Sequence, residues 1–296
     1  MKNHMQTIGI ISDIHGNYPA LEAILEHMAH EQVDTLYFLG DYITDGPEPQ
    51  RTLALLRQAA QHFSVLFIRG NREQYLIDHA NHPEQVWKPG PAQGALLYTY
   101  QRLTAQDLDW FRSMPICHSL KDVILCHGSP SRVNELLNVD GTNSTADETT
   151  AKWLRQIQKP LLICGHTHRQ GISRANGRTI LGAGSAGLPH NHDCLARAAL
   201  LHQNEAADWQ IQLLSIPYDV DAILRAYHHS ELMEMAPGWS HANCRFLATG
   251  HNYILKLLKR TRLLAAAQHP GMDLALPEIP QAIWLQAAAD LGLFSE

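Results

Sequence analysis

Apolar runs and amphipathic stretches alternate along the first 70 residues of the chain. Short runs rich in β-branched and other apolar residues at 7–11, 35–39 and 65–68 predict three buried strands. Apolar residues recur with helical spacing between Leu21 and Met28, and a second helix is expected from about Pro49 to Ala60. This βαβαβ order predicts parallel strands with right-handed helical crossovers, and ligand sites then lie beyond the carboxyl ends of the strands.

Residues 81–115 interrupt this alternation. Pro and Gly break the chain at 82–83 and 88–91, and short helical stretches follow near 96–100 and 105–111. We interpret this region as an inserted helical rim.

The chain then returns to strand-like patterns, which together suggest a second sheet packed on the first. The expected elements are a hairpin around Lys121-Asp122, a strand at 161–164, a hairpin around Asn176-Gly177, and strands at 198–202 and 209–216. Before the strand at 161–164, residues 141–144 are expected to form a mobile loop. Thr145-Ala146-Asp147-Glu148 fits a capping box that opens a helix through Gln156.

From Pro217 onward the pattern becomes helical, and this is the clearest composition shift in the chain. Apolar residues recur with helical spacing at 220–227, 253–267 and 283–291. We therefore expect an α/β (α+β) domain over residues 1–216 and a helical C-terminal extension over residues 217–296.

Composition places this chain of 296 residues among globular proteins and argues against two classes of binding partner. It is 45% hydrophobic and 18% charged, with a formal net charge of −6 and no long Lys/Arg run, so neither a stable nucleic-acid complex nor membrane-surface binding is expected. The five cysteines are scattered without a C-x-x-C pair, which argues against a disulfide scaffold or a thiolate zinc site. The first strand begins within a few residues of Met1 and no apolar run approaches transmembrane length, so a cytoplasmic location is expected.

Polar residues that can bind metals follow five of the strand-like runs. They are Asp13 and His15, Asp41, Asn71, His127, and His166 and His168. In an extended segment, residues two apart point the same way, so the Asp13 carboxylate and the His15 imidazole are expected to converge. The alternative for this stretch alone is a polar loop in which Asp13 and Asn17 cap the helix that starts near Pro19. For His127 or His166 alone, the alternative is a hydrogen-bonded core histidine.

The donor set indicates both the metal and the substrate. Oxygen and imidazole ligands without thiolate suit Mn, Fe, Co, Ni or Zn better than calcium. Seven ligands are too many for one tetrahedral ion but suit two ions that share a carboxylate, roughly 3.5–4 Å apart. Such a centre keeps a net positive charge, so it would attract an anionic ester, and a bridging hydroxide could attack phosphorus.

Five motifs, in order, resemble those of the calcineurin-like metallophosphoesterase superfamily. They are Asp13-Ile14-His15, Gly40-Asp41, Gly70-Asn71, His127-Gly128 and Gly165-His166-Thr167-His168. The resemblance spans about residues 7–216 and implies a β-sandwich flanked by helices. It also implies that Asp41 bridges two divalent metal ions, Mn above all; Asp13, His15 and His168 would hold one ion, and Asn71, His127 and His166 the other.

Arg72 departs from the pattern, because many members of the superfamily carry His at this position. The family His stabilises the transition state or protonates the leaving group. Arginine cannot act as a general acid, but its guanidinium can clamp phosphate oxygens. The alternative is an ion pair with Glu73 or with the rim. If Arg72 binds phosphate, good leaving groups should be favoured.

Further similarities concern the substrate. The run from Gly40 to Pro47 is similar to the branch of protein phosphatases and symmetrical dinucleoside-tetraphosphate hydrolases, and Gly184 to Pro189 is similar to small bacterial phosphodiesterases. His190 and His192 are candidate substrate contacts or inert surface histidines. We expect a phosphoesterase that cuts a phosphodiester or phosphoanhydride bond in a small phosphorylated substrate, with a nucleotide favoured. The alternatives are a phosphoprotein phosphatase and an interaction scaffold with weak or no activity, and the helical extension leaves room for a homo-oligomer.

Overall fold

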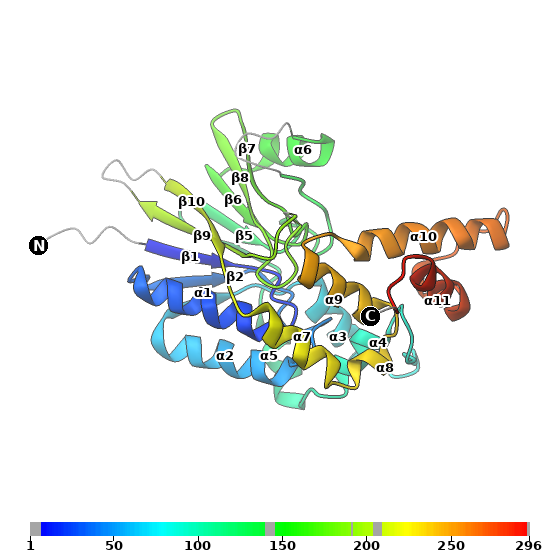
Figure 1. Cartoon of the computed structure of the whole chain (residues 1–296). Helices are drawn as coiled ribbons and strands as arrows, with labels where there is room; N and C mark the ends of the chain where they lie inside the picture. The colour runs from blue at the N-terminus through cyan, green and yellow to red at the C-terminus, as the bar shows by residue number, and fades with distance from the viewer. Residues whose placement is uncertain (1–6, 140–145, 191, 204–208, 295–296) are drawn as a thin grey trace, which may run out of the picture.

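The computed structural model describes residues 7–139, 146–190, 192–203 and 209–294, and contains two five-stranded sheets (Figure 1). The first sheet has the strand order β10-β9-β1-β2-β3. Its parallel part is formed by β1 (Thr7–Ile11), β2 (Thr35–Phe38) and β3 (Ser64–Phe67), as the βαβαβ pattern predicts. On the other side of β1, β9 (Ala196–Gln203) and then β10 (Trp209–Ile216) pair antiparallel.

The second sheet has the order β4-β5-β6-β8-β7. The hairpin of β4 (Cys117–Ser119) and β5 (Val123–Cys126) lies beside β6 (Leu161–Cys164), which pairs with the hairpin of β7 (Gln170–Ala175) and β8 (Arg178–Ala183). The two hairpins are thus confirmed. The assignment of β9 and β10 to the second sheet is wrong, because these long strands extend the first sheet through the free edge of β1.

Alternation along β1 separates two hydrophobic cores. Ile8 and Ile10 lie in the core between the sheets, whereas Ile11 packs in the core beneath the helices. Gly9 faces the helical side, where an added Cβ would lie 2.7 Å from the Sδ of Met28. The helices therefore pack closely against β1, and this packing holds the end of the strand from which the next loop begins.

Helices of the N-terminal region cover the first sheet and form the rim. α1 (Tyr18–His30) is capped by the Asn17 side chain, and α2 is Pro49–His62, as the apolar spacing predicts. α3 (Asn71–Asn81) was not predicted, because its first residues read as a strand-end loop. The rim contains α4 (Gly94–Tyr100) and α5 (Ala105–Ser113), close to the expected helices.

α6 (Glu148–Gln156) lies on the second sheet. Its N-cap is Asp147, whose side chain accepts from the Thr150 amide, so a capping box begun at Thr145 is not what opens this helix. Thr145 itself and the expected loop at 141–144 lie outside the described residues. A short polar run offers several alternative caps, which is why the sequence pattern misplaces this helix start by two residues.

The C-terminal residues are helical, as predicted. They form α7 (Val220–His228), α8 (Leu232–Met235), α9 (Trp239–Thr249), α10 (Tyr253–Gln268), the 3₁₀ turn Leu276–Glu278 and α11 (Gln281–Asp290). Figure 1 shows α9, α10 and α11 beyond the end of the sheets toward which β1 runs, whereas α7 packs beside α1. Ala95 and Tyr98 of the rim share a hydrophobic cluster with Ile223 and Tyr227, so rim and tail form one layer.

In the part of the chain that the structure describes, every helix is too short or too polar to cross a membrane.

Candidate metal centre

Loops at the carboxyl ends of the strands meet through backbone hydrogen bonds. The amide of Asp13 donates to the Gly40 carbonyl at 3.0 Å, and the amide of His15 donates to the Asp41 carbonyl at 3.0 Å. On the second sheet, the amide of Gly165 donates to the His127 carbonyl at 2.9 Å. The amide of His166 donates to both carboxylate oxygens of Asp13, which joins the two sheets. Residues from four separate loops are thereby fixed around one point.

Two groups of side chains converge there, each with ligand atoms within 4.8 Å of one another. One group is Asp13, His15 and His168, and the other is Asp41, His127 and His166. Asn71 joins the second group, because its Oδ1 lies 3.0 Å from the Nε2 of His127. The structure therefore brings together all seven residues that the sequence singled out.

The Asp41 carboxylate lies between the two groups. Its Oδ2 is 3.4 Å from the Nε2 of His127 and 3.8 Å from the Nε2 of His15. The Nε2 atom of His168 is 3.0 Å from that of His15 and 3.4 Å from the Oδ1 of Asp13. A single carboxylate oxygen is thus within reach of ligands from both groups.

Backbone carbonyls orient the imidazole rings toward the centre. The Nδ1 of His127 lies 2.6 Å from the Leu39 carbonyl oxygen, and that of His168 lies 2.8 Å from the Leu188 carbonyl oxygen. With each Nδ1 directed at a carbonyl, each Nε2 faces the other candidate ligands and can bind a cation once its proton is lost. This is the usual arrangement for a metal-binding histidine, so the residues fit a divalent cation.

The convergence of Asp13 and His15 has a different origin from the expected one. Both residues have left-handed backbone torsions, with φ of 53° and 51°, so they are not in an extended segment. The prediction of an extended Asp-x-His stretch is therefore wrong, although the two side chains do meet. Asn17 caps α1, as the alternative proposed, while Asp13 points into the centre instead.

Burial and mutual charge shift several pKa values in the metal-free protein. Burial alone would raise the pKa of Asp13, but His168 and His127 outweigh it and lower this pKa to about 2. Burial would lower the pKa of His127, but Asp41 and Asp13 raise it to about 9. Burial and the charge of the neighbouring His127 lower the pKa of His166 to about 4, because the raising effect of Asp41 and Asp13 is smaller. The centre thus holds anionic oxygens in a buried space, which favours a cation.

Glu73 supports the centre from beneath, a role that sequence reasoning missed. Its fully buried carboxylate accepts hydrogen bonds from the amides of Gly70, Asp41 and Tyr42 at 2.8–2.9 Å. It is therefore not the ion-pair partner of Arg72. The available signal was its position three residues after Gly70, where an acidic residue caps the first turn of a helix.

Arg72 instead pairs with Asp45, another residue that sequence reasoning did not select. The guanidinium Nη2 lies 3.0 Å from the Oδ2 of Asp45, and 22% of the Arg72 side chain is exposed. The Asp45 carboxylate also lies 3.3 Å from the Nδ1 of His15 and accepts from the Trp239 indole at 2.9 Å. Asp45 thus connects the centre, Arg72 and the C-terminal helices.

Of the two further candidate histidines, one lies at the centre. The ring centroid of His190 is 4.8 Å from that of His168 and 5.6 Å from that of Phe246. Burial and the His168 charge lower the pKa of His190 to about 3. His192 is exposed, and its backbone lies against Gly250 after α9.

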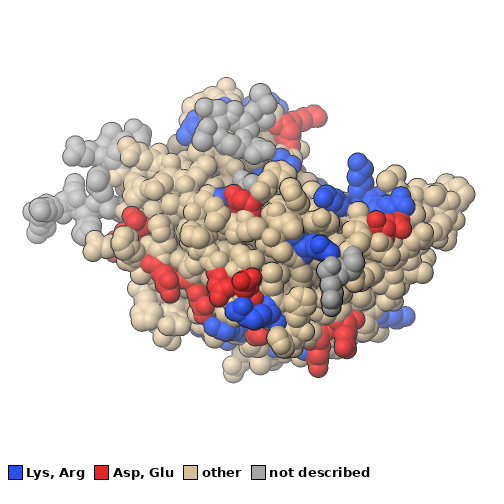
Figure 2. Space-filling view, viewed as in Figure 1, with Lys and Arg blue, Asp and Glu red and all other residues tan. Residues whose placement is uncertain are grey.

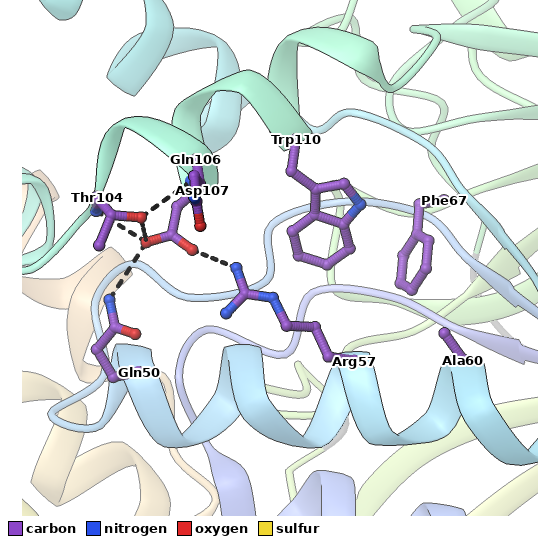
Figure 3. A pocket seen from close by; sticks show the side chains of 8 residues that line it. All are labelled: Gln50, Arg57, Ala60, Phe67, Thr104, Gln106, Asp107 and Trp110. Atoms are coloured by element: carbon purple, nitrogen blue, oxygen red, sulfur yellow. Dashed lines mark hydrogen bonds and ion pairs between the residues drawn. The ribbon is translucent and has the colours of Figure 1, made fainter.

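Two cavities differ in their relation to this centre. A cavity of about 250 Å³ borders Asn71, Arg72 and Asp45 and extends between the rim and the tail. A larger one, of about 460 Å³, lies between α2 and α5, and Figure 3 shows Asp107 within it, bonded to Arg57, Thr104 and Gln50. The larger cavity borders none of the seven candidate ligands, whereas the smaller one borders Asn71.

Comparison with known proteins gives the family. The family model for calcineurin-like phosphoesterases matches residues 6–226. A symmetrical bis(5'-nucleosyl)-tetraphosphatase from Dechloromonas aromatica is 30% identical over 138 residues, which is 43% of this chain and 47% of the relative, so the match spans about half of that relative's length. An uncharacterized protein from Methanocaldococcus jannaschii is 23% identical over 72% of this chain and 88% of its own length.

Solved structures agree on the fold. A metallophosphoesterase from Sphaerobacter thermophilus, at 23% identity, aligns with 83% of this chain and 100% of its own, with a TM-score of 0.64. A hypothetical protein from Pyrococcus horikoshii OT3, at 20% identity, covers 84% of this chain and 100% of its own, with a TM-score of 0.69. Two packed sheets, ligand groups at their common end and a family match over most of the chain lead to one conclusion. The chain belongs to the calcineurin-like phosphoesterase family.

Proposed function

We propose that this protein is a dinuclear metal-dependent phosphoesterase that hydrolyses a phosphodiester or phosphoanhydride bond in a small phosphorylated substrate. The observation that carries the proposal is the position of Asp41 between two groups of ligands, each of which has the donor set for one divalent ion. Two such sites joined by one carboxylate are the arrangement used for in-line displacement at phosphorus.

Each proposed metal ion has its own ligands. Asp13, His15 and His168 would hold one, Asn71, His127 and His166 the other, and Asp41 would bridge them. Oxygen and imidazole donors favour Mn over calcium, with Fe, Zn, Co and Ni as competitors. When bound, the ions would polarise the phosphoryl oxygens and make water a nucleophile at neutral pH.

The chain's own groups then bind and orient the ester. Arg72 lines the adjoining cavity and its side chain is partly exposed, so it can donate to phosphate oxygens while Asp45 holds it in place. His190, whose ring is tilted against that of His168, is the proposed second contact. Because Arg72 cannot supply a proton, leaving-group protonation falls to solvent or to a histidine, and good leaving groups are favoured.

A nucleotide is the substrate class that we favour. The relatives named as symmetrical tetraphosphatases support it, since they are described as acting on bis(5'-nucleosyl) tetraphosphates. A phosphoprotein remains the second candidate because of the Gly40–Pro47 run. We place the reaction in the cytoplasm, where the five free thiols of this chain would remain reduced.

Metal analysis combined with a substrate panel tests the proposal. The Mn-loaded protein should hydrolyse bis(p-nitrophenyl) phosphate, and the panel should rank diadenosine tetraphosphate and a cyclic nucleotide above a phosphoserine peptide. Faster turnover of the peptide would support the phosphatase alternative. Full metal occupancy without turnover of any phosphoester would reject the enzyme and favour the scaffold.

A further inference from the structure

The cavity of about 250 Å³ beside the metal centre is built from parts of the chain that lie far apart in sequence. Asn71 and Arg72 line it on the side of the centre. Residues of the tail, namely Trp239, Leu258, Leu276 and Trp284, line it together with small apolar residues of the rim. One end of the cavity is therefore charged, and the rest is apolar and aromatic.

Trp239 and Trp284 give the apolar part a defined geometry. Their ring centroids are 6.5 Å apart with an interplanar angle of 68°, an edge-to-face arrangement. The indole of Trp239 is held by its hydrogen bond to Asp45, which also binds Arg72. The Trp239 indole and the Arg72 guanidinium are thus held by the same carboxylate.

Trp284 has an unused hydrogen-bond donor. Its side chain is 1% exposed, and its indole Nε1 has no hydrogen-bond partner among the described residues. A buried indole N–H normally has an acceptor, because leaving it unpaired costs free energy. The nitrogen has less than 1 Å² of accessible surface, so an acceptor on a ligand in the cavity would supply the missing partner once the indole turns toward it.

We propose that this cavity binds one nucleobase of the substrate, with the phosphate directed toward Arg72 and a ring nitrogen or carbonyl of the base accepting from Trp284. The inference rests on the proposed phosphoesterase function and specifies its substrate side. Aromatic walls stack on any base, whereas an unpaired donor selects a heteroaromatic ring over a plain hydrocarbon. At about 250 Å³ the cavity is slightly below the roughly 300–1,000 Å³ of sites for drug-sized ligands, so it holds one base and not two.

Binding of adenosine, which has no phosphate to hydrolyse, tests this inference apart from catalysis. Calorimetry on the full-length, Mn-loaded protein should show saturable binding of one adenosine per chain. Trp284→Phe keeps the ring but removes the donor, and should weaken adenosine binding about fivefold to tenfold. Trp209→Phe is the matched control, since Trp209 also has a buried indole N–H without a partner among the described residues but lies on β10, outside the cavity.

A second variant guards against misfolding of the first. Ala92 lines the cavity and is half-buried, so Ala92→Leu should fill the space and weaken adenosine binding more than tenfold. Ala60→Leu, in the separate cavity of Figure 3, should leave it unchanged. Absence of adenosine binding to an enzyme that hydrolyses bis(p-nitrophenyl) phosphate, or equal binding by the wild type and Ala92→Leu, would overturn the inference alone. Loss of hydrolysis with adenosine still bound would count against the proposed function alone.

Discussion

Six polar residues of the centre have left-handed backbone torsions: Asp13, His15, Asp41, Asp45, His166 and His168. This region costs an L-residue roughly 1–2 kcal/mol, although Asp and His adopt it more readily than branched residues do. Such strain persists only where the surroundings determine the backbone, and here the loops are buried and hydrogen-bonded to one another. The carboxylates and imidazoles are therefore preorganised before any ion binds.

Arg72→His tests the role of the residue that departs from the family pattern. Histidine can donate a proton to the leaving group, whereas arginine cannot, and a well-placed general acid contributes roughly 10²–10⁴-fold. The variant should narrow the gap in kcat/KM between p-nitrophenyl and alkyl phosphodiesters at least tenfold. Arg51→His, at an exposed position on α2, is the control. An unchanged leaving-group dependence in Arg72→His would show that this position does not govern protonation.

Metal binding should release a proton from His127. The pKa of this imidazole is raised to about 9 in the metal-free protein, so the ring is protonated at pH 7 and must lose its proton to bind a cation. The apparent Mn affinity should therefore rise about tenfold per pH unit between pH 6 and 8 and level off near pH 9. Calorimetry in buffers of different ionisation enthalpy measures the proton release. A binding enthalpy independent of the buffer would contradict this account of His127.

At the scale of elements, the start of α3 fixes the loop that follows β2. A Cβ added at Gly40 would lie 2.5 Å from the Cα of Gly70, so the two loops touch through glycine backbone. The Glu73 carboxylate accepts hydrogen bonds from backbone amides of both loops, and the Arg72 amide donates to the Asp41 Oδ1 at 2.9 Å. One helix start thereby positions Asn71 and Asp41 together.

Glu73→Gln should disturb this junction. The amide group would place a donor against backbone N–H groups, leaving at least one buried N–H unpaired, which costs about 1–3 kcal/mol. Urea unfolding of the metal-free protein should show that loss of stability. Glu26→Gln, on the exposed face of α1, should stay within about 0.5 kcal/mol of the wild type. Equal stability of the two variants would show that Glu73 does not stabilise the loops of the centre.

Sequence patterns predicted most of the elements and the seven residues that lie together at the candidate centre, but not how the strands and loops are joined. Apolar runs ending in Asp, Asn or His identify the strands and the ends where ligands meet, because parallel strands share that edge. The edge that β9 joins depends on long-range pairing, which no local pattern contains. Glu73 and Asp45 were missed because their partners, backbone amides and side chains of other loops, are known only from the fold. Trp239 and Trp284 were missed because they lie far from the five motifs along the chain.

At the scale of the whole molecule, the tail is tied to the centre. The Tyr227 hydroxyl donates to the backbone carbonyl of Asp45 at 2.6 Å, and the Asn243 amide donates to it at 3.3 Å. The boundary between residues 216 and 217 stays a prediction, since the family match continues to residue 226 in α7.

Homo-oligomerisation also stays a prediction. Leu255 and Leu263 of α10 are about half exposed, and Figure 2 shows Lys and Arg side chains gathered over this helix. The contacts of Asp45 nevertheless show that the tail is part of the wall around the candidate site within a single chain.

The Mn content of purified, reconstituted Asp41→Asn protein tests the central claim most directly. One carboxylate oxygen lies within reach of both ligand groups, so its loss should weaken both sites together. Atomic emission should find two Mn ions per chain in the wild type and in Asp78→Asn, an exposed control on α3, but well under one in Asp41→Asn. A wild type that binds a single ion, or an Asp41→Asn protein that keeps one ion tightly, would contradict the bridged two-metal centre.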